Sequence, residues 1–145
     1  MAPFSTWNCL NRAPRNSDSC VLLLDEDEDF RNGLAEHLRD DGYVVRECAI
    51  TTDLPPLDAL RDVNLVITDY QLPGDDGLRF SDRFHHSHPD VPIVMVTSFW
   101  THHLEAASRR RTFLHLLLKP LEYTELFALI GRLTPRPRRP RTLLM

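Results

Sequence analysis

Five short apolar runs, separated by segments in which apolar residues recur every three or four positions, set the pattern of this 145-residue chain. The runs are residues 21–24, 43–48, 65–67, 93–98 and 113–118. In the run at 65–67 apolar and polar residues do not alternate, which is typical of a strand buried on both faces of a parallel sheet. We predict one strand for each run.

The segments between the runs predict helices. In the first, Phe30, Leu34 and Leu38 recur every four residues on one helical face, and Gly42 follows the last turn as a stop. Further helices are predicted for residues 54–60, 78–86, 101–111 and 123–133. The helix at 54–60 is entered through two prolines, which a first helical turn tolerates.

Strands that alternate with helices predict an α/β fold with a parallel sheet, because each return to a parallel strand needs a right-handed crossover. A chain of this length fits one domain. Open sheets of this kind bind ligands beyond the carboxyl ends of their strands. Side chains that directly follow the strands are therefore the first candidates for chemistry.

Carboxylates follow two of the predicted strands. Asp69 comes soon after the run at 65–67, before a loop rich in proline and glycine, and Asp25 and Glu26 follow the run at 21–24. One interpretation is that Asp69 only caps the following turn. The other is that neighbouring strands bring these acids together, where they stay ionised only with a cation among them. Oxygen-only ligands favour Mg²⁺.

Other polar clusters have structural explanations. The acids at 27–29 lie at the start of a predicted helix, where capping and the helix dipole favour them. The three cysteines form no Cys-x-x-Cys pair and are interpreted as buried thiols. The histidines at 85–88 and 102–103 lack an inward-facing set of metal ligands. The arginines at 109–111 are interpreted as a solvated helix end, with a partner contact as the alternative.

Residues 21–133 resemble the receiver domain of two-component response regulators. The motifs that carry the resemblance, in chain order, are Asp25-Glu26 after the first strand, Asp-x-x-x-Pro-Gly-x-x-Gly beginning at Asp69, Thr97 at the end of the fourth strand, and Lys119-Pro120 after the fifth. The resemblance implies a flavodoxin-like, doubly wound, five-stranded parallel sheet of order 2-1-3-4-5 with five helices. It divides the chain into a flexible extension (1–19), a receiver domain (20–133) and a basic Pro/Arg tail (134–145).

The resemblance also implies chemistry. Asp69 would accept a phosphoryl group from the phosphohistidine of a sensor histidine kinase or a phosphotransfer protein. Mg²⁺ would be held by Glu26, Asp69 and the backbone carbonyl of Gln71, with Asp25 supporting it through water. The family usually has Asp where this chain has Glu26, and the longer side chain changes where the metal is held.

Three further residues take roles from the resemblance. Lys119, the only lysine of the chain, would pair with Asp69 and then with the phosphoryl oxygens. Thr97 would donate its hydroxyl to the phosphoryl group. Leu116 stands where the family usually has the aromatic residue that rotates inward with that threonine, and it cannot gate in the same way. The aromatic pair at 99–100 is the candidate to replace that residue or to shield the site.

Charge is unevenly distributed. Residues 21–133 contain 11 basic and 20 acidic residues, a net charge of −9, whereas the last twelve residues carry four arginines and no acid. The body is therefore expected to repel nucleic acid, and the tail is too short to be an attached DNA-binding domain. No apolar run approaches the roughly 20 residues of a membrane span, and the first twenty residues lack a signal-peptide core. We expect a cytoplasmic protein.

The leading hypothesis is a stand-alone receiver that assists its own phosphorylation and dephosphorylation but is not an enzyme. Its phosphorylation would change contacts with a downstream protein, or with a second copy in a homodimer, through the face containing Leu104, Leu116 and Tyr123. The alternative, suggested by Glu26 and Leu116, is a receiver-like interaction module that phosphorylation does not control. A Mg²⁺-dependent phosphatase with an Asp nucleophile would need a second acid two residues later, where this chain has Gln71.

Overall fold

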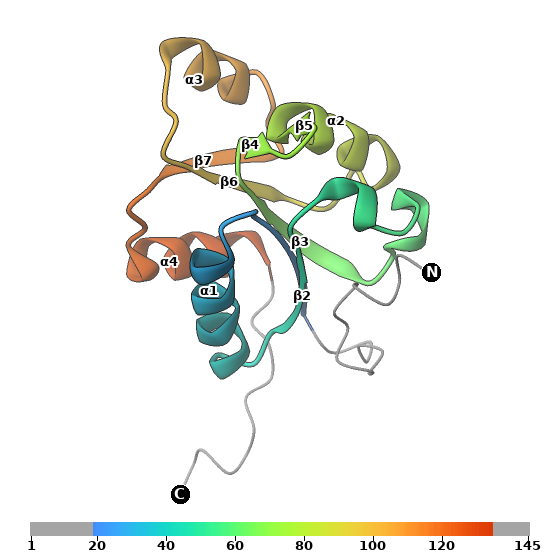
Figure 1. The fold of residues 1–145 in the computed structure, drawn as a ribbon, viewed down its shortest axis with the longest axis vertical. Coiled ribbons are helices and arrows are strands. Elements are labelled where there is room, and N and C mark those ends of the chain that lie inside the picture. Colours follow the sequence, from blue (N-terminus) through green and yellow to red (C-terminus); the bar gives the residue numbers. More distant parts are fainter. Residues whose placement is uncertain (1–18, 135–145) are drawn as a thin grey trace, which may run out of the picture.

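The computed structural model describes residues 19–134, which form a parallel sheet covered by helices on both faces (Figure 1). The strands of the sheet are β1 (Cys20–Leu24), β2 (Val44–Cys48), β3 (Val63–Thr68), β6 (Ile93–Thr97) and β7 (Leu114–Leu118). Their order is β2-β1-β3-β6-β7, and every neighbouring pair is parallel. The strands β4 (Gln71–Leu72) and β5 (Asp75–Asp76) form a separate hairpin, so β6 and β7 are the fourth and fifth strands of the main sheet. Its order is therefore the predicted 2-1-3-4-5. The predicted fold class is confirmed.

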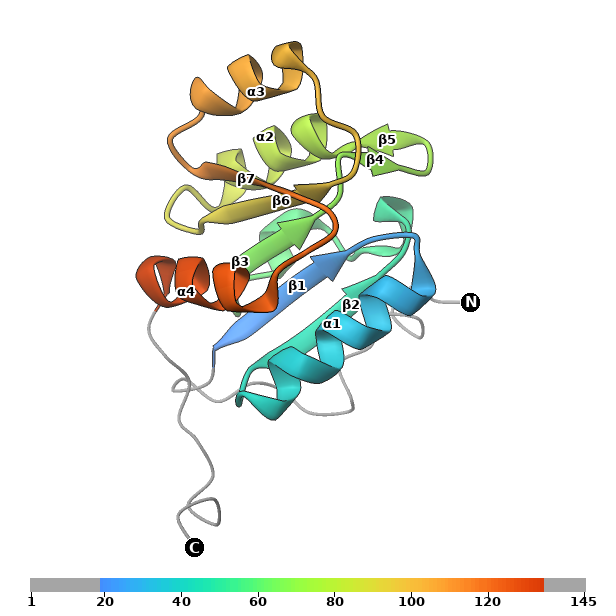
Figure 2. The ribbon, with the colours of Figure 1, turned by 90° about the vertical axis from the view of Figure 1, so that its left-hand side faces the viewer.

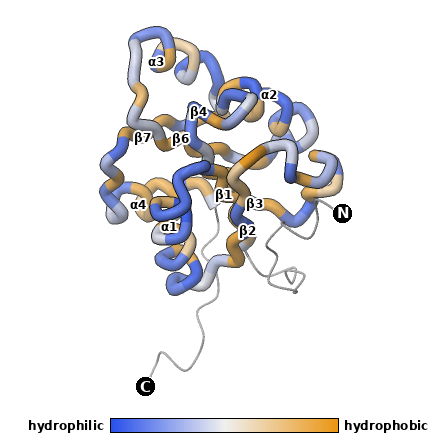
Figure 3. Tube along the Cα trace, viewed as in Figure 1, coloured by the Kyte–Doolittle hydropathy of each residue, from blue (hydrophilic) through white to orange (hydrophobic). Residues whose placement is uncertain are grey.

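Two helices cover each face of the sheet. Figure 2 shows α1 (Glu28–Asp40) and α4 (Tyr123–Leu133) on one side, with α2 (Gly77–Ser87) and α3 (His102–Arg109) behind. Successive side chains of a strand point to opposite faces. Val21 and Leu23 of β1 therefore join the core under α1 and α4, while Leu22 and Leu24 join the core under α2 and α3. The hydrophobic segments of the chain gather on the central strands (Figure 3).

Capping residues fix where the helices begin and end. Asp27 accepts a hydrogen bond from the backbone N–H of Phe30 at the start of α1, as predicted for the acids there. Asp76 and Thr101 cap α2 and α3 in the same way. Gly42, with φ of 101°, follows the end of α1 in a conformation that favours glycine.

The prediction of an α-helix at residues 54–60 is wrong. This segment contains only a single 3₁₀ turn, η3 (Leu57–Ala59), and another such turn, η2 (Thr51–Asp53), precedes it, so the described chain has four α-helices rather than five. Leu54 and Pro56 both have extended ψ angles, 149° and 140°. The prolines explain why no helix forms here, because Pro55 forces Leu54 out of the helical conformation and neither proline has an N–H to donate.

The loop after Asp69 is more ordered than the sequence indicated. It contains the β4–β5 hairpin, in which Gln71 pairs with Asp76 and Leu72 with Asp75. Gly74 makes the turn with φ of 67°. This hairpin leads directly into α2.

Some predictions concern residues outside the described part of the chain. The N-terminal extension before Ser19 and the basic tail after Thr134 both lie there. Within residues 19–134, Cys20 and Cys48 are buried thiols, as predicted. None of the helices in this range is long and apolar enough to cross a membrane.

Candidate functional site

Two carboxylates meet at the carboxyl edge of the sheet because of the register between β1 and β3. Leu24 pairs with Thr68, so Asp25 and Asp69 are the residues that directly follow the two strands. The N–H of Asp69 donates to the carbonyl of Leu24 at 3.1 Å, and the N–H of Asp25 donates to the carbonyl of Cys48 at 3.2 Å. Both acids are therefore held by backbone hydrogen bonds to the last residue of a neighbouring strand.

A third strand end adds the cation. Thr97 of β6 pairs with Leu118 of β7, and the N–H of the next residue, Lys119, donates to the carbonyl of Thr97 at 2.9 Å. The Lys119 ammonium reaches back across the edge of the sheet. It donates to Asp25 Oδ2 at 2.8 Å and to Asp69 Oδ2 at 3.2 Å. One ammonium thus bridges both predicted carboxylates.

Burial and charge together set the electrostatics of this trio. Only 3% of the Asp25 side chain is exposed, against 15% for Asp69 and 16% for Lys119. Burial raises the pKa of Asp25, and the hydrogen bond from Lys119 opposes that rise. Burial disfavours the charged form of Lys119, but the hydrogen bond to Asp25 and the charges of both acids outweigh it and raise the Lys119 pKa. The ammonium therefore remains charged at neutral pH.

Backbone groups surround the more exposed carboxylate. Asp69 Oδ1 accepts hydrogen bonds from the N–H groups of Tyr70 at 2.6 Å and Gln71 at 3.4 Å. On the other side, Gly77 donates its N–H to the carbonyl of Tyr70 at 2.6 Å. A Cβ atom at Gly77 would collide with the Asp69 carbonyl oxygen and press on Met95. The start of α2 is thus packed directly against the backbone of Asp69.

The structure gathers the predicted metal ligands only in part. Asp25 and Asp69 face the same ammonium, whereas Glu26 is exposed on the turn before α1 and Gln71 is exposed on β4. Within residues 19–134, no three His, Cys, Asp or Glu side chains form a group suited to a metal ion.

Thr97 and the aromatic residue Phe99 lie at the next strand end. The Thr97 side chain is buried, and its Oγ1 accepts a hydrogen bond from the N–H of Phe99 at 3.0 Å. The Phe99 side chain is 45% exposed and stacks on Tyr70, with 5.8 Å between ring centroids and 10° between ring planes. A stack of an exposed and a half-buried aromatic ring therefore includes the residue that directly follows Asp69 in the chain.

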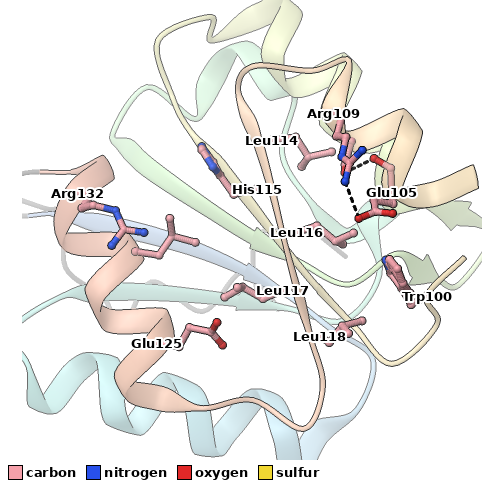
Figure 4. Close-up of a pocket in the computed structure, with 12 residues that line it drawn as sticks. Trp100, Glu105, Arg109, Leu114, His115, Leu116, Leu117, Leu118, Glu125 and Arg132 are labelled. Carbon is pink, nitrogen blue, oxygen red and sulfur yellow. Dashed lines mark hydrogen bonds and ion pairs between the residues drawn. The ribbon is translucent and has the colours of Figure 1, made fainter. Parts of the chain in front are cut away.

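Leu116 is half-buried on β7 and lines an open hollow of 580 Å³ between α3 and α4. Figure 4 shows Trp100 at one end of this hollow and the ion pair of Arg109 with Glu105 beside it. Leu104, predicted to share a surface with Leu116, is buried in the core. The exposed part of this face is therefore formed by β7 and the sides of the two helices.

One residue near the site was not identified from the sequence. The ring centroid of Phe30 lies 4.1 Å from Lys119 Nζ. Periodicity assigned Phe30 to the buried face of a helix, and it does pack against the core under α1 and α4. Its position in the first turn of α1, just beyond the acids, was the only signal of a second role.

A family model supplies the assignment of the chain. The model of the response regulator receiver domain matches residues 21–131. The chain belongs to this family. It is a receiver domain of two-component signalling, a phosphoacceptor module rather than a conventional enzyme, and receivers typically bind a divalent metal.

Relatives and solved structures agree with this assignment. The receiver is 29% identical over 119 residues to the DNA-binding transcriptional regulator NtrC of Rhizobium meliloti. This match covers 82% of this chain and 25% of that protein. A CheY-like receiver domain protein from Methanospirillum hungatei has the same fold, with a TM-score of 0.74, 22% identity, and coverage of 80% of this chain and 93% of that one. A response regulator from Burkholderia pseudomallei, solved with a phosphorylated aspartic acid and a calcium ion, has a TM-score of 0.69 at 22% identity, with coverage of 81% and 68%. The receiver spans 24% to 30% of the length of the curated relatives it matches.

Proposed function

We propose that this receiver accepts a phosphoryl group on Asp69 from a histidine kinase or a phosphotransfer protein, and that the phosphorylated form makes different contacts with another protein. The observation that carries the proposal is the arrangement of Asp69, Asp25 and Lys119. The carboxylate of Asp69 is partly exposed, its Oδ2 accepts a hydrogen bond from the only lysine, and the buried Asp25 shares that lysine. This arrangement combines a reachable nucleophile with a fixed positive charge.

The proposed reaction is an in-line displacement at phosphorus. One oxygen of the Asp69 carboxylate attacks the phosphorus atom of the donor, and a P–O bond forms as the P–N bond to the donor's imidazole breaks. The leaving nitrogen keeps the electron pair of that bond. The product is an acyl phosphate on Asp69.

Lys119 stabilises the charge of this reaction in the proposal. Its ammonium already contacts Asp69, and its raised pKa keeps it charged while the phosphoryl oxygens approach. Thr97 is the candidate donor to the phosphoryl group once it has formed, because it ends the strand next to Lys119. For that role its hydroxyl must turn toward the phosphoryl group while its oxygen keeps the hydrogen bond from Phe99.

Mg²⁺ is the proposed cofactor, because the donor atoms at this edge of the sheet are of the chemical type that Mg²⁺ prefers. Asp25 and Asp69 offer carboxylate oxygens, which a hard cation prefers. Glu26, an exposed residue in the turn that follows Asp25, offers a third carboxylate. The backbone carbonyl of Gln71 is the fourth proposed ligand. When bound, Mg²⁺ neutralises charge between the carboxylates and the incoming phosphoryl oxygens.

The output of the proposed switch is a change of protein contact. The hollow beside Leu116 and the exposed side chains of Phe99, Trp100 and Leu118 provide surface for a downstream protein or for a second copy of the chain. Glu26 and Leu116, which depart from the residues usual in the family, favour the rival function, an interaction module without phosphorylation control. Labelling of the protein separates the two.

The test is incubation with Mg²⁺ and acetyl phosphate, followed by intact-protein mass spectrometry and peptide mapping. We expect one added phosphoryl group on Asp69, its loss on treatment with hydroxylamine, and no labelling in EDTA. Asp69→Asn is expected to remain unlabelled, whereas Asp90→Asn, at an exposed aspartate, is labelled like the wild type. A protein that takes no phosphoryl group from acetyl phosphate or from a cognate kinase would support the rival function instead.

A further inference from the structure

We propose that Phe30 is a positioning residue whose ring holds the Lys119 ammonium against Asp25 and Asp69. A cation near the face of an aromatic ring is attracted to the negative side of the ring quadrupole, most strongly where water is excluded. Lys119 Nζ lies 4.1 Å from the centroid of the Phe30 ring, and the Lys119 side chain is only 16% exposed. The consequence for phosphorylation rests on the function proposed for Asp69, but the contact itself does not.

The Lys119 ammonium contacts three different side chains. Two of its contacts are the carboxylate oxygens of Asp25 at 2.8 Å and Asp69 at 3.2 Å, and the ring is a third. A lysine side chain has four flexible carbons, so charge alone does not fix the place of its ammonium. The ring restricts the ammonium to the position from which it reaches both acids.

The ring is itself held by a closed series of contacts that begins and ends at Asp25. Asp25 Oδ1 accepts from the N–H of Asp27 at 2.9 Å, and Asp27 Oδ1 accepts from the N–H of Phe30 at 3.1 Å. The Phe30 ring contacts Lys119, and Lys119 donates to Asp25. The capping of α1 therefore places the ring relative to the carboxylates.

A neutral ring suits this position better than an acid would. A third carboxylate would also hold the ammonium, but it would add negative charge where an anionic phosphodonor must approach the two acids already present. The ring attracts the cation without that repulsion. It can keep Lys119 in place before and after the charge on Asp69 changes.

The contact is tested first by NMR, because a single lysine gives a single set of lysine side-chain signals. With ¹³C-labelled lysine, the ε-CH₂ protons of Lys119 are expected upfield of an exposed lysine, shielded by the ring. Phe30→Leu should remove that shift, and Phe127→Leu, at a partly buried ring that packs near Tyr123 on α4, should leave it unchanged. Signals unaffected by Phe30→Leu would overturn the proposal.

The consequence is tested by the rate of Asp69 labelling at saturating Mg²⁺ and acetyl phosphate. We expect Phe30→Leu to slow labelling roughly threefold to tenfold, because it removes the ring. Phe30→Tyr, which keeps an aromatic ring, is expected to be labelled at the wild-type rate. Difluorophenylalanine at position 30 keeps the shape but weakens the ring face, so it should slow labelling, while the same residue at position 127 should not.

The outcomes separate the two proposals. A wild type that takes no label contradicts the proposed function, and the NMR comparison then decides alone whether the ring holds the ammonium. A labelled wild type whose Phe30 variants all react at its rate overturns the positioning role. The tyrosine and fluorinated variants keep the test decisive if the leucine variant folds poorly.

Discussion

Gly77 leaves no room for an added Cβ atom beside the site. Its missing side chain lets the start of α2 approach the backbone of Asp69, where a Cβ would collide with the carbonyl oxygen. Gly77→Ala must therefore displace backbone rather than a flexible side chain. We expect it to lower the free energy of unfolding by about 1–3 kcal/mol, measured by urea denaturation.

Gly131 provides the matched control for that substitution. It lies in α4, and a Cβ there would meet no heavy atom within 4 Å. Gly131→Ala is expected to raise the free energy of unfolding by about 0.5–1 kcal/mol, because alanine loses less conformational entropy in a helix. Equal destabilisation by both substitutions would contradict the close approach at Gly77.

At the residue scale, the sequence indicated the trio but not its aromatic neighbour. Asp25 directly follows an apolar run and Asp69 follows one after a single threonine, so the strand ends were enough to predict that these two acids converge, whereas the place of Lys119 came from the resemblance. Phe30 reaches the ammonium through the rotation of α1 against the sheet, which periodicity does not specify. Glu26 remains a predicted ligand whose side chain is exposed.

At the scale of elements, the wrong predictions concern segments whose structure depends on local backbone chemistry and not on hydrophobic periodicity. The five strands were predicted because continuous apolar runs are typical of buried parallel strands. The segment at 54–60 was misassigned because two prolines were interpreted as a helix start, whereas together they keep the chain extended. The β4–β5 hairpin was missed because two-residue strands carry almost no periodic signal.

His115 on β7 makes the stability of the fold depend on pH. β7 lies at the edge of the described sheet, and its His115 is half-buried, with burial and then the charge of Arg132 lowering the His115 pKa below the usual 6.5. The unfolded chain therefore binds this proton more readily than the folded one. Stability from His115 is fully present above pH 6.5 and is lost as pH falls through the folded pKa.

Substitution isolates this contribution. We expect the drop in unfolding free energy between about pH 7.5 and pH 5 to be smaller in His115→Gln than in the wild type, measured by denaturant titration at both pH values. His86→Gln, at an exposed histidine, should retain the wild-type drop. An unchanged drop in His115→Gln would mean that its neutral form is not favoured by folding.

At the scale of the whole molecule, the site and the end of the described fold lie at opposite edges of the sheet. α4 runs away from the edge of the sheet at which Lys119 lies (Figure 2). At the end of α4, the hydroxyl of Thr134 donates a hydrogen bond to the carbonyl of Ile130 at 3.1 Å. Deleting residues 135–145 is therefore expected to leave Asp69 labelling unchanged.

The same deletion tests the charge argument. The body carries a net charge of −9, so four tail arginines can support only weak, salt-sensitive DNA binding without sequence preference. Gel-shift assays at physiological salt should show no sequence-specific binding by the full chain. Sequence-specific binding that disappears with residues 135–145 would contradict this expectation.

The two-sided packing of β1 also limits which changes in chain length the protein can tolerate. One residue inserted between Val21 and Leu24 would exchange the side chains that face the two cores and move Asp25 out of register with Asp69. An inserted residue between α1 and β2 changes neither, because that turn lies at the other edge of the sheet. Natural variation in the length of this chain is therefore expected in the turns opposite the site and not within the central strands.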